Sequence, residues 1–421
     1  MDEHDTARVQ RRTLGVLVVS QIVGTIGVGV APTIGILLAE QVMQDEALAG
    51  LARTASTLGA ALVGVPLGVL AARRGRRRAL STGWWIAALG AFLIVAAAQW
   101  SLAIPLFLGL LLIGVGSATS LQARFAATDL AQPHHRARAL SLVVWVGTAG
   151  SVLGPNLGVP GEVIERGSGL TAYAAAFLIA GICLALAGLV VLIWLRPDPL
   201  LLIESRAAVR PGASPGVRGG RLRQALVALR GNPRARLAVV AILTAQIVMV
   251  SIMTMTPVHI ADHGGSVTII GVTISLHVLG MYALSPIVGV IADRAGHRAT
   301  IAVGIVILLA ALAAAAGRPD DTGWIVASLI LLGVGWSFVN VAGSALFSVV
   351  VPVESRAAAQ GGVDALSNLL GAIAAFVAGP LLVVSSFATL AIVAMFVLVP
   401  LVLLVAAHAP RAEAAGAPPA V

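Results

Sequence analysis

The chain has 421 residues, of which 58% are hydrophobic and 11% charged, and its mean hydropathy is +0.99. This balance excludes an ordinary soluble domain and predicts an all-α protein with many membrane spans, whose main partner is the lipid bilayer. The formal net charge of +9 comes from arginines placed between apolar runs, a position that does not favour a nucleic-acid partner.

Apolar runs long enough to cross a bilayer, about 20 residues each, recur along nearly the whole chain. The first is too long for a cleavable signal peptide and is interpreted as a membrane helix. Twelve runs are predicted to span the membrane: residues 13–38, 49–71, 79–99, 102–127, 139–158, 170–195, 237–258, 268–291, 299–316, 323–348, 361–383 and 385–407.

The arginines predict the orientation of these spans. With the N-terminus inside, 23 of the 27 basic residues fall in cytoplasmic segments, and Arg124 lies within the fourth span. Only Arg53, Arg166 and Arg318 fall in outer segments. This asymmetry predicts a protein of the cytoplasmic membrane with both termini in the cytoplasm.

Charged residues within or beside the spans are candidates for gating or ion coupling, because a charge is costly in a bilayer. Arg124 and Asp129 lie in the inner half of span four, and Asp364 lies at the start of span eleven. A charge that snorkels or braces the inner face explains Arg124 equally well. The single cysteine, Cys183, allows no disulfide within the chain and is interpreted as a packing residue.

The sequence divides into two halves. Residues 196–236 contain Pro, Gly, Ser and nine arginines, which predicts a basic cytoplasmic linker between six-span halves at 1–195 and 237–421. The halves also repeat, since residues 68–77 after span two match residues 289–298 after span eight at an offset of 221 residues. Such a duplication is typical of transporters.

Both repeated segments resemble the motif Gly-x-Leu-Ala-Asp-Arg-x-Gly-Arg-Arg of the major facilitator superfamily, whose members are twelve-helix transporters with two pseudo-symmetric halves. In that family the motif braces contacts between helices at the inner face. The first copy has Ala72 where the family prefers Asp, whereas the second copy keeps Asp293. The resemblance therefore implies that Asp293 is a gating residue and carries more of this role.

Four of the six methionines after the initiator lie within 33 residues, together with a histidine. Met249 and Met253 are four apart in span seven, and His277 and Met281 are four apart in span eight, so each pair shares one helix face. Because the two spans are consecutive and antiparallel, the pairs are predicted to lie at matching depths. Thioether and imidazole groups suit Cu(I) rather than Mg²⁺ or Ca²⁺. The alternative is a packed methionine pair with a proton-relay histidine.

A second pair, His259 and His263, lies beyond Pro257 near the outer end of span seven. This pair is a candidate for metal capture from the outside, with a solvated or interfacial loop as the alternative. Met255 falls on another face of the helix and is interpreted as packing.

The pattern Met-x-x-x-Met followed by His-x-x-x-Met resembles the CcoA-like copper importers of the superfamily. That resemblance implies copper uptake across the cytoplasmic membrane, with Met249, Met253, His277 and Met281 as ligands, copper as the transported substrate and no resident cofactor. It also implies a periplasmic or cytoplasmic copper chaperone as a partner. Those importers carry additional functional cysteines, whereas this chain has Cys183 alone.

Two other functions are weighed against copper import. A proton-coupled exporter of drugs or small metabolites predicts a cavity lined by aromatic and carboxylate groups, and only 4% of the residues are aromatic. An enzyme is not expected, because the sequence shows no nucleophile–base constellation and no phosphate-binding loop.

Overall fold

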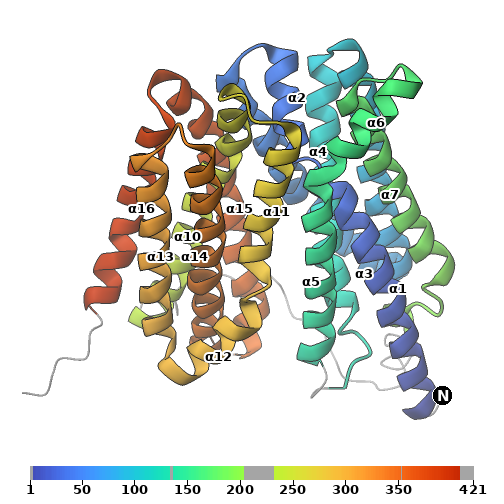
Figure 1. The fold of residues 1–421 in the computed structure, drawn as a ribbon. Helices are drawn as coiled ribbons and strands as arrows, with labels where there is room; N and C mark the ends of the chain where they lie inside the picture. The colour runs from blue at the N-terminus through green and yellow to red at the C-terminus, as the bar shows by residue number, and fades with distance from the viewer. Residues whose placement is uncertain (1–2, 133–135, 203–231, 352, 408–421) are drawn as a thin grey trace, which may run out of the picture.

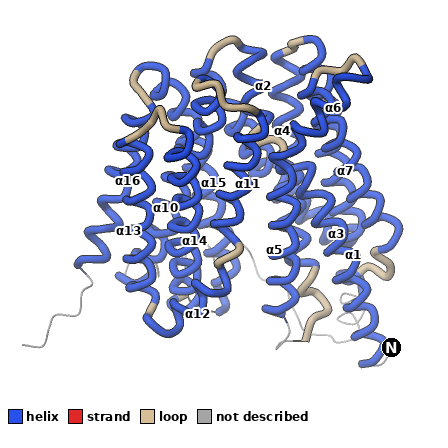
Figure 2. The backbone as a smooth tube through the Cα atoms, viewed as in Figure 1, coloured by secondary structure: helices blue, strands red, loops and turns tan. Residues whose placement is uncertain are grey.

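The computed structural model describes residues 3–132, 136–202, 232–351 and 353–407, and these ranges are helical without a β-strand (Figure 1, Figure 2). The helices are α1 (Glu3–Gly29), α2 (Ile34–Met43), α3 (Glu46–Trp100), α4 (Ala103–Ala126), α5 (Arg136–Leu153), η2 (Gly154–Leu157), α6 (Gly158–Ser168), α7 (Ala172–Trp194), α10 (Pro233–Asp262), α11 (Val267–Tyr282), α12 (Ser285–Ala295), α13 (His297–Gly317), α14 (Thr322–Val350), α15 (Val353–Val384) and α16 (Phe387–Ala407).

Eleven helical segments among the described residues are long and apolar enough to cross a membrane. One of them belongs to α3, which has 55 residues. A straight helix of that length measures about 80 Å, far more than the ~30 Å hydrocarbon core of a bilayer. The helix is interrupted at Gly75, where φ is 87° and ψ is 166°, and α3 therefore supplies two spans. The prediction of an all-α protein with twelve spans is confirmed.

Prolines divide three of the spans into shorter helices, because proline has no N–H to donate to a helix. Pro32 separates α1 from α2, Pro155 lies in η2 between α5 and α6, and Pro286 lies in the first turn of α12. The predicted run 268–291 is thus not one straight helix but α11 followed by α12. In contrast, α10 continues through Pro257 to Asp262.

The helices form two halves that stand side by side (Figure 1). The N-terminal half contains α1–α7 and the C-terminal half α10–α16, and each half has its own buried apolar core. Gly75 and Gly296 both have a φ of 87° at equivalent helix starts, so the sequence repeat extends to the backbone. Of the predicted linker, residues 203–231 lie outside the described residues.

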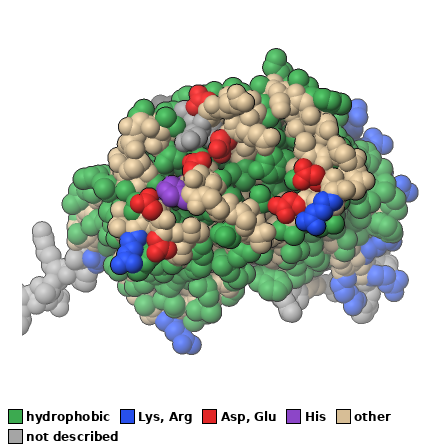
Figure 3. All heavy atoms as spheres, turned by 45° about the horizontal axis from the view of Figure 1, so that its top comes forward, with side chains coloured by type: hydrophobic (Ala, Val, Ile, Leu, Met, Phe, Trp, Pro, Cys, Tyr) green, Lys and Arg blue, Asp and Glu red, His purple; other side chains and the backbone are tan. Residues whose placement is uncertain are grey.

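The two ends of the bundle differ in charge. The end that holds the N-terminus carries the arginines of residues 73–78 together with Arg294 and Arg298, and we call it the arginine-rich end. The other end, called the opposite end, carries acidic side chains around its rim, with basic side chains and a histidine between them (Figure 3). These are Glu40, Asp45, Glu162, Glu165, Asp262, Asp320 and Asp321.

Hydrogen bonds join the two halves near the opposite end. Ser275 Oγ donates to Val152 O at 2.6 Å, and Asn156 Nδ2 donates to Ser275 Oγ at 2.6 Å. Thr54 Oγ1 donates to Ala372 O at 3.0 Å, which joins α3 to α15. At the arginine-rich end, α5 and α12 stand apart in Figure 1. The bundle is therefore closed across its opposite end.

Candidate functional site

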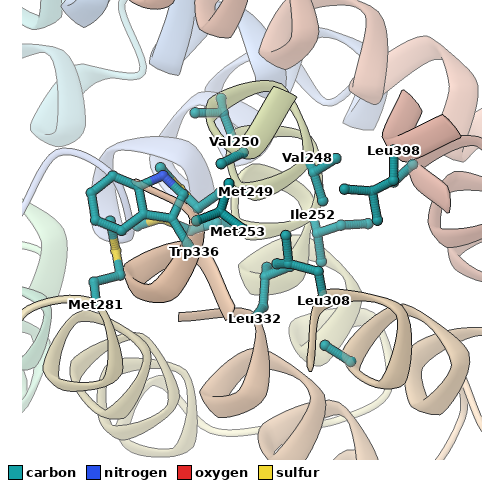
Figure 4. Packing of buried hydrophobic residues seen from close by; sticks show 14 of the residues in the cluster. Val248, Met249, Val250, Ile252, Met253, Met281, Leu308, Leu332, Trp336 and Leu398 are labelled. Atoms are coloured by element: carbon teal, nitrogen blue, oxygen red, sulfur yellow. The ribbon is translucent and has the colours of Figure 1, made fainter. Parts of the chain in front are cut away.

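The four predicted metal ligands all lie buried in the C-terminal half. Met249 and Met253 project from α10, and His277 and Met281 project from α11; none is more than 7% exposed, and His277 is fully buried. The three methionines belong to one apolar cluster. In Figure 4 their side chains gather around the indole of Trp336, which comes from α14.

The packing of α10 and α11 differs from the sequence prediction. α10 and α11 were expected to pair directly, but α14 packs against both of them more extensively than they pack against each other. Trp336 therefore belongs to the same site as the methionines (Figure 4). Nothing in the spacing of the two motifs indicates this third helix.

The ring of His277 is held in one orientation. Its Nδ1 lies 2.7 Å from the carbonyl oxygen of Leu329, and because a carbonyl only accepts, Nδ1 carries the proton and donates it. Nε2 then keeps its lone pair, and it has no hydrogen-bond partner among the described residues. A histidine that donates through one nitrogen to a backbone carbonyl and offers the other is the usual form of a metal-binding imidazole.

A glycine on α14 makes this arrangement sterically accessible. A Cβ atom at Gly333 would lie 2.3 Å from the carbonyl oxygen of His277 and 3.2 Å from its Nδ1. Only glycine lets α14 approach α11 closely enough for Leu329 to accept the hydrogen bond from His277.

A charge from the other half also acts on the site. The charge of Arg53, on α3, interacts with the Tyr282 phenol and with the His277 ring. The Tyr282 ring packs edge-on against Trp336, with the ring centroids 5.7 Å apart. The indole Nε1 of Trp336 is buried and has no partner among the described residues.

Sequence analysis missed Arg53, because counting charges assigned it to an outer segment. In the structure it lies seven residues inside α3, beside the contact between Thr54 and Ala372. The available signal was its position within the predicted run 49–71, since a charge inside an apolar run is a candidate functional residue.

Both histidines of the predicted outer pair, His259 and His263, form contacts within the protein. His259 Nε2 donates to Pro319 O at 2.7 Å, and its ring stacks on Phe387 at 4.3 Å. His263 has Nδ1 at 2.8 Å from His259 O and Nε2 at 3.2 Å from Asp320 Oδ1. Both ring nitrogens of His263 therefore face oxygen atoms, and this pair fastens α10 to the loop between α13 and α14. Metal capture by the pair stays a prediction.

The coupling candidates form contacts at the arginine-rich end. Arg76 donates to both Asp129 oxygens, at 2.8 and 3.2 Å, and to Gln122 Oε1 at 3.0 Å. Burial raises the pKa of Asp129 above its ordinary value, and the hydrogen bonds from Arg76 offset part of this rise. The first half therefore has an ion pair despite Ala72.

A second acidic residue, Asp198, forms contacts at the arginine-rich end of the first half. Asp198 accepts hydrogen bonds from the backbone N–H groups of Arg76 at 3.1 Å and of Arg77 at 2.8 Å, which caps the second segment of α3. The counterpart predicted for the second half, Asp293, is exposed in the last turn of α12. Its larger share of the bracing role stays a prediction.

Arg124 lies in the N-terminal half and Asp364 in the C-terminal half. Their charges interact, although the two side chains form no ion pair within the described ranges. Arg124 Nε is buried without a hydrogen-bond partner there. Because the two charges belong to different halves, the pair stays a candidate for gating or coupling.

The donor set restricts which metal this site can hold. Among the described residues, no three His, Cys, Asp or Glu side chains cluster as a metal site. A metal held at His277 would therefore need thioether sulfur from the methionines as its further ligands. One imidazole with thioethers selects a soft monovalent ion such as Cu(I) over Mg²⁺, Ca²⁺ or Mn²⁺.

Comparisons with known proteins agree with the fold. The sequence profile described as Major Facilitator Superfamily matches residues 16–266 and 257–420. The chain is 36% identical over 401 residues to the Uncharacterized MFS-type transporter YddS of Bacillus subtilis (strain 168), covering 94% of this chain and 91% of that protein. It is 31% identical over 414 residues to the Riboflavin transporter RfnT of Brucella anthropi, covering 97% and 99%.

A solved structure shows the same architecture. The crystal structure of the nucleoside transporter NupG matches with a TM-score of 0.70 at 17% sequence identity, covering 94% of this chain and 98% of that chain. At that identity the likeness extends to the fold alone.

Proposed function

The chain belongs to the Major Facilitator Superfamily and is a multi-pass membrane transporter, and from this premise we propose that it imports copper as Cu(I). Transport proceeds by alternating access, in which the two halves open the central site first to one side and then to the other. The family and the names of the relatives indicate a transporter rather than an enzyme.

The observation that carries the proposal is the state of His277. Its Nδ1 proton is held by Leu329 O, its Nε2 has no hydrogen-bond partner among the described residues, and Met281 follows one helical turn later. Met249 and Met253 belong to the same apolar cluster as Met281. Thioethers form weak, exchangeable bonds with Cu(I), which suits a carrier that must release its cargo.

The proposed direction, import, rests on the resemblance to the CcoA-like copper importers, and the orientation that we propose fits it. The arginine-rich end faces the cytoplasm of a cell with this protein in its inner membrane, which places both termini inside. The acidic rim at the opposite end then faces outward and attracts cations. A copper chaperone, periplasmic or cytoplasmic, is the partner that delivers or receives the ion.

The test measures copper uptake by cells that express His277→Ala or Met249→Ala. Loss of a ligand lowers uptake about tenfold or more, by analogy with changes at other metal sites. Met395→Ala in α16 is the matched control, because it removes a methionine that is only partly buried and not at the site. Normal uptake in both ligand variants, with the protein present in the membrane, overturns the proposal.

A second candidate is a proton-coupled carrier that exports drugs or small metabolites. The observations that favour it are Trp336 with its free Nε1, the adjacent Tyr282 ring and the nearby cation of Arg53, which together suit a planar aromatic cargo. The relative named as a riboflavin transporter supports an organic cargo as well. Broad resistance to organic compounds in an overexpressing strain, without a change in copper sensitivity, favours this candidate.

A further inference from the structure

A groove lies between the last two helices of the C-terminal half. α15 and α16 are consecutive in the chain, yet each packs against α10 far more extensively than against the other. α10 therefore forms the floor of the groove, and its walls come from residues 370–381 of α15 and residues 390–397 of α16. The groove has a volume of about 230 Å³, and we call it the α15–α16 groove.

The α15–α16 groove is apolar along its length. Its floor is formed by Ile247 and Ser251, and the Ser251 hydroxyl donates to Ile247 O within the same helix at 2.8 Å. Residues 365–407, which supply both walls, contain no Asp, Glu, Lys, Arg or His. A polar or charged group placed inside the groove would therefore lose its water without gaining a partner. These surfaces suit a hydrocarbon chain.

The groove is continuous with the surface that faces the bilayer. α15 and α16 supply the two least buried of the eleven candidate spans, and α16 lies at the edge of the bundle (Figure 1). At the rim of the groove, Ile373, Val377 and Val393 are between 42% and 51% exposed. In a multi-pass membrane protein such a surface contacts lipid hydrocarbon, so a lipid chain reaches the groove directly from the bilayer.

The length of the groove matches one leaflet of a bilayer. Leu370 and Leu381 are separated by eleven residues, or about 16 Å of helix, and half of the ~30 Å hydrocarbon core is about 15 Å. A helix of a second chain, about 10 Å across, would need roughly 1,200 Å³ over the same length. The groove is several times too small for a helix and has the depth of one acyl chain.

We propose that the α15–α16 groove binds one acyl chain of a phospholipid from the leaflet at the opposite end. The turn between α15 and α16, with Ser385 and Ser386 exposed, lies at the level where the chain joins its headgroup. Because the walls carry no charged group, the groove recognises the chain and not the charge of the headgroup. The site does not depend on which cargo the protein carries.

A bound chain would support the helix that carries two of the methionines. Ser251 is about 200° around α10 from both Met249 and Met253, so the groove lies behind the face that holds their side chains. The lipid chain therefore completes the packing of α15 and α16 against α10 and leaves the candidate site unoccupied.

Native mass spectrometry of the purified full-length protein tests the proposal, with phosphatidylethanolamine or phosphatidylglycerol added in a mild detergent. Val377→Phe and Ala374→Phe place a larger side chain in the groove. Val306→Phe in α13 is the matched control, because Val306 is 66% exposed and does not line the groove. We expect the wild type and the control to retain one phospholipid that both groove variants lose, and to retain the two headgroup types equally.

Photochemical labelling of the wild type supplies a readout that needs no variant to fold. The full-length protein is placed in liposomes that contain a phospholipid with a diazirine in its acyl chain. We expect several-fold more label in residues 370–381 and 390–397 than in the exposed part of α13 at residues 303–306. Thermal unfolding checks that the three variants are folded.

Several results would overturn the proposal. Equal labelling of the groove and of α13, or retention of the phospholipid by both folded groove variants, means that no chain is held there. Loss of the phospholipid from Val306→Phe as well indicates a general lipid shell. Retention of phosphatidylglycerol alone means that headgroup charge decides binding. A dimer that lacks lipid and is dissociated by Val377→Phe assigns the groove to a second copy of the chain.

Discussion

Burial and the ion pair with Arg76 shift the pKa of Asp129 in opposite directions. Its side chain is 12% exposed and that of Arg76 13%, so both groups have lost most of their water. The pKa of Asp129 is raised because burial outweighs the hydrogen bonds from Arg76. The ion pair thus orients Arg76 toward α4 without stabilising the folded state in proportion to its short distances.

The raised pKa predicts a definite pH dependence. The folded state binds the Asp129 proton more tightly than the unfolded state does. Proton binding at Asp129 therefore stabilises the folded protein fully below the ordinary pKa of 3.8, and this stabilisation is lost as the pH rises through the pKa of the folded state. Asp129→Asn keeps an acceptor for Arg76 and removes the buried charge. We expect it to unfold at neutral pH no more easily than the wild type and to lack this pH-dependent loss.

Thermal unfolding of the purified protein between about pH 4 and 7 measures this effect. Asp129→Ala is the comparison, because it leaves Arg76 with Gln122 alone and costs about 1–3 kcal/mol. If Asp129→Asn is as unstable as Asp129→Ala, then the ionised carboxylate stabilises the fold and this account of its burial is wrong.

Individual site residues differ in how far the sequence reveals them. His277 was found because an imidazole in an apolar run is costly unless it has a function or a partner. Its partner, the carbonyl of Leu329, has no sequence signal, since every residue carries the same carbonyl and only packing selects one. Trp336 and Tyr282 were missed for a similar reason, because aromatic residues in spans are ordinary packing groups until their neighbours are known.

At the scale of elements, the apolar runs predicted where the spans lie, because each must cover the same thickness of hydrocarbon. They did not predict that α11 and α12 are separate helices, although Pro286 marks the break. They also did not predict that α10 continues past Pro257. Proline removes one hydrogen bond in either case, and tertiary packing decides whether the helix ends there.

The contact between α11 and α14 depends on Gly333, which gives a test of the site at this scale. In Gly333→Ala the new Cβ meets the His277 carbonyl, so the helices must move apart and the hydrogen bond to Leu329 weakens. We expect a loss of about 1–3 kcal/mol in stability, together with weaker Cu(I) binding.

Thermal unfolding and chelator competition on the same preparation measure the two effects. Gly64→Ala is the matched control, because a Cβ at this position in α3 meets nothing within 4 Å. Gly64→Ala is expected to be neutral or slightly stabilising. Wild-type stability in Gly333→Ala contradicts the close packing described here.

For the whole molecule, the hydrogen bonds between the halves define one state of the transport cycle. Ser275 of α11 is hydrogen-bonded to Val152 at the end of α5 and to Asn156 in η2, and Thr54 joins α3 to α15. These contacts lie at the opposite end, and alternating access requires them to break in each cycle. The duplicated sequence predicted two halves that move, but which end is closed depends on packing that a repeat cannot reveal.

A cross-link between Asn156→Cys and Ser275→Cys tests this state. The native side chains are in hydrogen-bond contact, with Asn156 Nδ2 2.6 Å from Ser275 Oγ, so a short bifunctional thiol reagent reaches both. Replacing Cys183, the only native cysteine, with serine leaves these two thiols alone to react.

Because the joined halves cannot open at this end, the reagent is expected to abolish uptake of cargo. A reagent that contains a reducible disulfide is expected to restore uptake after reduction. Each single-cysteine variant should transport normally after the same treatment. Full transport by the cross-linked protein contradicts the assignment of these contacts to a gate that must open, and points instead to a fixed seam between the halves.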